Sequence, residues 1–180
     1  MGFLDEVLEN VGKPHNASKG FEAGTHEVII GEVEVTTKDT QKMKNAPIIR
    51  VTVFDENDNE KTAQCTLYFH TEGGARMSVA KVLGLLVHNV SEDRKEEVRT
   101  LGKKLFGSID TPEKSRDVAA KLLNDKLIGK KAYLVAEPND KYLTTAYGDL
   151  WHYPANPSGK AETTSEAPDI DPDDIPDFEV

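Results

Sequence analysis

Thr25-His-Glu-Val-Ile-Ile-Gly-Glu-Val-Glu-Val-Thr-Thr-Lys38 is the stretch that decides the fold. Apolar and polar residues alternate along it, which is typical of a half-buried strand. The apolar positions are even at Val28 and Ile30 and odd at Val33 and Val35. This change of parity across Gly31 predicts a bulge, because one extra residue moves every later side chain to the other face. A long strand bent at a glycine is one way for a small barrel to turn a corner.

Two further segments with the same alternation follow, at residues 48–54 and 62–70. In the first, Ile49, Val51 and Val53 share one face, and the second alternates in the same way. A cluster of acidic and amide side chains at residues 55–60 is typical of a turn. Three strands joined by short connections predict an antiparallel meander.

The hydrophobic period then changes from that of a strand to that of a helix. Between about residues 75 and 127, apolar residues recur at helical spacing, and Thr111 followed by Pro112 is typical of a helix start. Strand patterns return at residues 128–135 and 142–151. Five strands with a helical segment between the third and the fourth have the layout of an OB-fold barrel.

We therefore expect a mainly β fold, an OB-fold-like barrel of five strands with a helical insert. The barrel domain should span residues 25–153, and the insert should cover about residues 75–127. Residues 1–24 should form an N-terminal helix and a linker, since apolar residues stand at positions 3, 4, 7, 8 and 11. Residues 154–180 should form a disordered acidic tail, because they contain too little apolar surface to offset the entropy of ordering.

The composition is that of an ordinary globular protein. The 180 residues carry a net charge of −10, with 37% hydrophobic and 30% charged residues. No apolar run is long enough to cross a bilayer, and the first residues lack the basic and apolar regions of a secretory signal. Cys65 is the single cysteine, so no intrachain disulfide can form. We expect a cytoplasmic protein that does not bind membranes.

No pattern in the sequence indicates catalysis. The five histidines are scattered, and none has a cysteine or carboxylate at metal-ligand spacing. There is neither a glycine-rich phosphate loop nor a nucleophile elbow. We expect no enzymatic activity, no metal and no cofactor, which leaves binding as the expected function.

The negative charge is concentrated near the C-terminal end of the sequence. Residues 160–180 have eight acidic side chains and one lysine, a net charge of −7, which leaves −3 for residues 1–159. A nearly neutral body can carry a local basic strip. We expect this strip in the loop after the first strand, where Lys38, Lys42, Lys44 and Arg50 face a single acid, Asp39.

Aromatic side chains near these cations are candidates for stacking on bases. Strand parity predicts that the second and third strands point such side chains outward, and the last two strands add others beside lysines. Two alternatives are a plain solvated hairpin tip and aromatic rings that pack under the helical insert. The candidate DNA-binding residues are Lys38, Lys42, Lys44, Arg50, Phe54, Tyr68, His70, Lys131, Tyr133, Lys141 and Tyr142.

The tail contains the segment Asp171-Pro-Asp-Asp-Ile-Pro-Asp-Phe178. It resembles the acidic tip of bacterial single-stranded DNA-binding proteins, in which aspartates lead into Ile-Pro-Phe. The resemblance implies that the tail recruits replication or recombination proteins, whereas composition alone allows a merely solubilising tail. The segment departs from the pattern because Asp177 interrupts it and Glu179 and Val180 follow. The candidate partner-binding residues are Asp173, Asp174, Ile175, Pro176 and Phe178.

The whole chain resembles phage-encoded single-stranded DNA-binding proteins, including a group with a helical insert and an opening strand seen here as Gly24-Thr-His-Glu-Val28. The resemblance implies a protein that coats single-stranded DNA without sequence specificity during replication, recombination or repair, in the cytoplasm of a bacterial host. The alternative is a non-catalytic protein-interaction module or a DNA-mimic inhibitor of a DNA-processing enzyme. Either protein could form a homo-oligomer.

Overall fold

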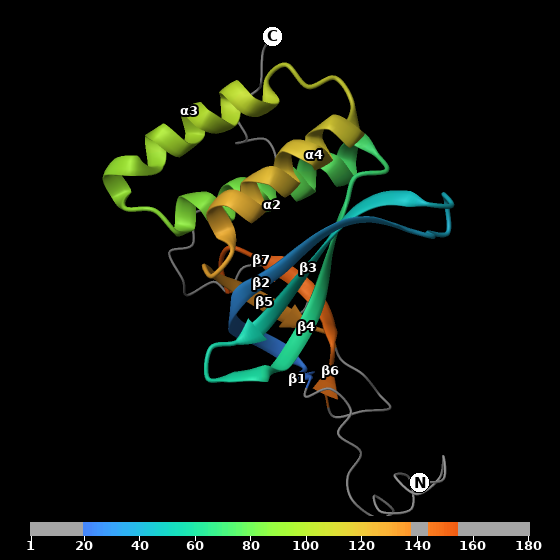
Figure 1. Ribbon diagram of the computed structural model, residues 1–180, viewed down its shortest axis with the longest axis vertical. Helices are drawn as coiled ribbons and strands as arrows, with labels where there is room; N and C mark the ends of the chain where they lie inside the picture. Colours follow the sequence, from blue (N-terminus) through green and yellow to red (C-terminus); the bar gives the residue numbers. More distant parts are fainter. Residues whose placement is uncertain (1–19, 138–143, 155–180) are drawn as a thin grey trace, which may run out of the picture.

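The computed structural model describes residues 20–137 and 144–154 (Figure 1). Five strands close a barrel in the order β2-β3-β4-β7-β5. A separate sheet of two short strands, β1 (Phe21–Glu22) and β6 (Thr144–Thr145), lies beside the barrel. The predicted closed barrel of five strands is confirmed, and its strand order is compatible with an OB fold. The barrel strands are β2 (Gly24–Lys38), β3 (Ala46–Asp55), β4 (Asp58–Tyr68), β5 (Lys131–Ala136) and β7 (Tyr147–Trp151).

The bulge predicted in the first barrel strand is present. The pairing of β2 with β3 shifts register between Ile30 and Glu32, on either side of Gly31. A Cβ atom at Gly31 would lie 3.0 Å from Cδ1 of Phe54, so the ring packs directly over the glycine. The bulge lets β2 pair with β5 through residues 24–29 and then turn away from it.

The barrel closes where β7 meets β4 in parallel. Only two residue pairs join these strands, Gln64 with Tyr147 and Cys65 with Gly148. A Cβ atom at Gly148 would lie 2.5 Å from the carbonyl oxygen of Val135, so closure requires a glycine there. The inward-facing side chains of all five strands form the core, which includes Val28, Ile30, Val51, Val53, Cys65, Leu67, Leu134 and Leu150.

The helices gather over one side of the barrel, above the strands in Figure 1. Because they contribute about as much of the chain as the strands do, the fold is mixed α/β, and the expectation of a mainly β class is wrong. Helices α2 and α4 pack on each other, α2 also contacts β4 and β7, and α4 contacts β2 and β3. The helices are α2 (Glu72–His88), α3 (Lys95–Phe106) and α4 (Pro112–Leu122), with short 3₁₀ and π segments at Glu92–Arg94 and Leu123–Leu127.

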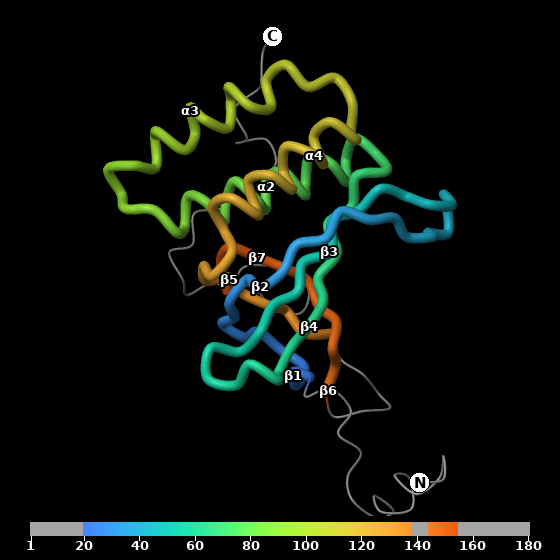
Figure 2. Tube along the Cα trace, in the orientation of Figure 1, coloured from blue at the N-terminus to red at the C-terminus, as the bar shows by residue number. Residues whose placement is uncertain are grey.

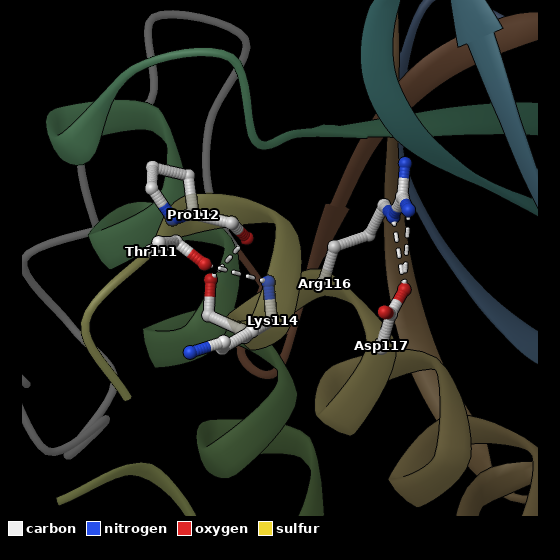
Figure 3. Close-up of polar contacts among 6 residues, drawn as sticks. Thr111, Pro112, Lys114, Arg116 and Asp117 are labelled. Carbon is white, nitrogen blue, oxygen red and sulfur yellow. Dashed lines mark hydrogen bonds and ion pairs between the residues drawn. The ribbon is translucent and has the colours of Figure 1, made fainter. Parts of the chain in front are cut away.

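Side-chain caps begin the two helices that pack on the barrel. The hydroxyl of Thr71 accepts a hydrogen bond from the backbone N–H of Gly74 at 3.0 Å. At α4, the hydroxyl of Thr111 accepts one from the backbone N–H of Lys114 at 3.3 Å (Figure 3). Pro112 takes the first turn of α4, as the sequence predicted, since its missing N–H would have no helical partner there.

Some predictions fall outside the described residues. The expected N-terminal helix lies in residues 1–19, and the acidic tail lies in residues 155–180. Within the described part of the chain, no helix is both long enough and apolar enough to span a membrane.

Candidate nucleic-acid interface

A groove of about 680 Å³ lies between the outer face of β4, one side of α2 and the edge of β7. Strand parity points Gln64, Thr66 and Tyr68 out of the barrel and into this groove. The N-terminal half of α2 forms the opposite wall, because the helix starts at the end of β4 and runs back across it. The lining residues are Lys38, Gln64, Thr66, Leu67, Tyr68, Gly74, Met77, Ser78, Lys81, Glu137, Thr145, Tyr147, Gly148 and Asp149.

The groove offers apolar and aromatic surface to a ligand. Met77 is 41% exposed and Tyr147 is 63% exposed, although both are large apolar residues. The partly buried ring of Tyr68 lies edge-on to the ring of His70, with 5.8 Å between their centroids. The hydroxyl of Ser78 donates to the carbonyl oxygen of Tyr68 at 2.9 Å, which ties α2 to the end of β4.

A fixed ion pair lies in the groove between its two walls. The ammonium of Lys81 lies 2.6 Å from a carboxylate oxygen of Asp149 and 4.3 Å from the centre of the Trp151 ring. The side chain of Lys81 is only 12% exposed, whereas that of Asp149 is 45% exposed. Because Asp149 and Trp151 both hold this cation, Lys81 joins α2 to β7 and is not free to follow a ligand.

The lysines predicted in the loop after the first strand lie on the hairpin that joins β2 and β3, which extends away from the barrel (Figure 2). We call residues 32–49 the arm. At its tip, the backbone N–H of Thr40 donates to the carbonyl oxygen of Met43 at 2.9 Å, and that of Asn45 donates to the carboxylate of Asp39 at 2.8 Å. Three exposed lysines, the arm lysines, have no ion pair with any described residue: Lys38, Lys42 and Lys44.

Two other predicted cations are engaged by acids. Arg50 forms an ion pair with Glu34 across the β2–β3 ladder at 2.9 Å. Lys131 lies 2.8 Å from a carboxylate oxygen of Glu27 and 3.6 Å from one of Glu56. The hydrogen bond and charge of Glu27, with a contribution from Glu56, raise the pKa of Lys131. Both side chains would have to leave these carboxylates to bind a phosphate.

Two other predicted aromatic residues, Phe54 and Tyr133, do not line the groove. Phe54 covers the bulge at Gly31, near the far end of β3. Tyr133 packs on His88 at the end of α2, with 5.9 Å between ring centroids. Lys141 and Tyr142 lie in the segment 138–143, outside the described residues, as do the five candidate residues of the tail.

The structure thus places Lys38 and Tyr68 together in the groove, and it adds residues that the sequence did not single out. Met77 and Lys81 come from α2, and helical spacing alone does not tell which face of a helix meets a barrel. Tyr147 was visible only as one of several aromatic residues in the last strands. The strand order of an OB fold could have placed Tyr147 beside the groove, because that order puts β7 next to β4.

The described residues contain no group of three or more histidine, cysteine, aspartate or glutamate side chains that could hold a metal ion. Neither protein-family models nor the sequences of curated proteins show a match to this chain. Interpretation of the groove therefore depends on its own chemistry.

Proposed function

We propose that the chain is an OB-fold-like protein that binds single-stranded DNA without sequence specificity. The observation that carries this proposal is a groove with exposed aromatic and thioether side chains that is lined by Lys38, an unpaired lysine of the arm. Lys42 and Lys44 lie further out on the same arm, also without an ion pair to a described residue. Non-specific binding of single strands needs this pairing of a positive track with stacking surfaces. OB folds bind oligonucleotides on the corresponding strands and loops.

The groove would hold the bases of the single-stranded DNA, and the arm would hold its phosphates. Bases would contact Tyr68, Tyr147 and Met77, and each base stacked on an aromatic ring contributes about 1–3 kcal/mol. Phosphates would contact the arm lysines, because Lys81 is already paired with Asp149 and Lys131 with Glu27. Every base has a flat face, so this mode of binding does not select a sequence.

The acidic tail would recruit partners, as its resemblance to the tip of single-stranded DNA-binding proteins implies. Its negative charge would also compete with DNA for the arm lysines. Removal of residues 168–180 should therefore leave the DNA affinity unchanged or raise it, and the affinity should be measured in this truncated form as well as in the full chain.

Fluorescence anisotropy with labelled oligo-dT tests the proposal. The variant K42E/K44E should weaken binding about tenfold or more at low salt, because two phosphate contacts become repulsive. The matched control is K103E/K104E, which makes the same change in net charge at two exposed lysines of α3. The proposal fails if neither the full nor the truncated chain binds, or if both variants lose the same affinity.

One observation favours the rival function, a protein-interaction module or DNA mimic. The outer side of β2 carries exposed carboxylates, including those of Glu27, Glu32 and Glu34. Such a protein would leave oligo-dT unbound and would instead bind a nuclease or helicase at a fixed ratio, which calorimetry would detect.

A further inference from the structure

The arm has one strand edge without a partner. Beyond the bulge, β2 no longer pairs with β5, whose register with β2 covers residues 24–29. The other edge of the arm is closed at its base, because the backbone N–H of Phe69 donates to the carbonyl oxygen of Pro47 at 3.0 Å. Residues 32–38 of β2 therefore present a run of backbone groups that no other described strand uses.

This edge is open to solvent. Val35 is 46% exposed and the side chain of Glu34 is 54% exposed, and the neighbouring Glu32, Thr37 and Lys38 are exposed as well. In Figure 1 the arm extends beyond the barrel, clear of the helices. An exposed valine on an open edge is the feature that favours pairing with another strand.

The sequence of the edge is complementary to itself. If two copies pair antiparallel about a two-fold axis at Val35, Glu32 of each copy lies opposite Lys38 of the other. Val35 then lies opposite its own equivalent, and Val33 lies opposite Thr37. Opposite charges and β-branched pairs are the cross-strand neighbours that stabilise antiparallel sheets.

The charges present on the edge suit this arrangement. Glu34 is already neutralised by Arg50 of the same copy at 2.9 Å, so it does not oppose the approach of a second strand. Glu32 and Lys38 have no ion pair with another described residue, and the two-fold axis would give each of them a partner. Charges on an edge strand usually keep other strands away. Here Glu32 and Lys38 would instead favour antiparallel pairing with a second copy of the same edge.

We propose that residues 32–38 of β2 pair with the same residues of a second copy of this chain and form a homodimer through a continuous sheet. This inference does not depend on the proposed DNA binding. In the dimer Lys38 would pair with Glu32 of the second copy, so that Lys42 and Lys44 would be the arm lysines left to contact phosphates. A single strand pair buries little surface, so the dimer should be concentration-dependent.

Sedimentation of the full chain without DNA, over a wide range of concentration, gives the first test. The wild-type protein should form a dimer, and E32K should raise its dissociation constant about tenfold or more, because the two-fold axis places like charges together twice. K38E should have the same effect, and the exchange E32K/K38E should restore the dimer. E22K, which reverses an exposed charge on β1, is the matched control and should leave the dimer intact.

Cross-linking tests the register. The substitution V35C places the two thiols directly opposite each other, whereas T37C places them about 13 Å apart along the strands, beyond the reach of a disulfide. Mild oxidation should therefore link V35C into a covalent dimer and leave T37C monomeric. The natural Cys65 does not interfere, because it is fully buried and burial raises its pKa.

Three results would each overturn the inference: a monomer at all concentrations, a dimer that E32K and K38E leave intact, or equal cross-linking of V35C and T37C. Because these experiments measure mass and not affinity for oligo-dT, they can fail while the proposed DNA binding holds. DNA binding can likewise fail while the dimer is present.

Discussion

His152 gives the chain a specific sensitivity to acid. It follows β7, is 7% exposed, and lies directly under Gly84 of α2. Neither of its ring nitrogens bonds to another described residue. Burial, together with the nearby His88 and Lys81, lowers the pKa of His152 to about 4. The barrel and α2 can therefore pack together fully only while this ring is neutral.

The sign and size of the effect follow from the two pKa values. In the unfolded chain the ring titrates near pH 6.5, so between about pH 6.5 and pH 4 the unfolded chain binds a proton that the folded chain does not. The free energy of unfolding must fall as the pH falls through this range. The loss is about 2 kcal/mol on going from about pH 7.5 to about pH 5, and it reaches about 3 kcal/mol below pH 4.

Urea denaturation at both pH values, on the wild type and on H152L, measures this term. The leucine variant cannot titrate at this position, so its stability should fall by about 2 kcal/mol less than that of the wild type between the two pH values. Other titrating groups contribute to both proteins and cancel in the comparison. Equal losses in the two proteins would show that His152 is not held neutral under α2, and the reasoning would be refuted.

Three further predictions concern packing, capping and charge. G84A should lower the free energy of unfolding by about 1–3 kcal/mol, because its Cβ would lie 2.5 Å from the His152 ring. The control G73A should not lower it, because a Cβ at Gly73 would have nothing within 4 Å. Equal effects of the two substitutions in thermal denaturation would contradict this prediction. T111A should cost about 1 kcal/mol in urea titrations through loss of the α4 cap, and no change would mean that Thr111 does not cap in solution. If only the three arm lysines contact phosphates, log K for oligo-dT should fall against log salt with a slope of about −2, and a slope beyond about −3 would bring Arg50 and Lys131 into the site.

The parts of the fold that depend on local rules could be predicted from the sequence. The bulge at Gly31 follows from a parity change over a few residues, and the start of α4 follows from Thr111 and Pro112 alone. The closure of the barrel could not be predicted in this way, because β7 and β4 meet at only two residue pairs that are far apart in the sequence. Such a contact depends on the assembled barrel, and no periodicity of either strand encodes it.

Some residues of the candidate site could likewise be predicted from local sequence, whereas the pairing of others could not. Lys38 and Tyr68 were predicted from loop position and strand parity, and both line the groove. Parity also placed Arg50 on the outside, but its pairing with Glu34 depends on the register that the bulge sets. A slip of one residue would have put Arg50 opposite a different side chain, on a different face. Neutralisation of Arg50 is therefore a property of the register and not of the local sequence.

Ion pairs distinguish the cations of the barrel and α2 from those of the arm. On the barrel, carboxylates of β2 engage Arg50 and Lys131, and Asp149 engages Lys81, so these cations add little to the outward field. On the arm, Asp39 directs its carboxylate to the backbone N–H of Asn45. The arm lysines are thus without an ion pair to a described residue, whereas Arg50, Lys81 and Lys131 each have one. Net charge alone is therefore a poor guide to the ligand, because it does not show which cations are free to contact one.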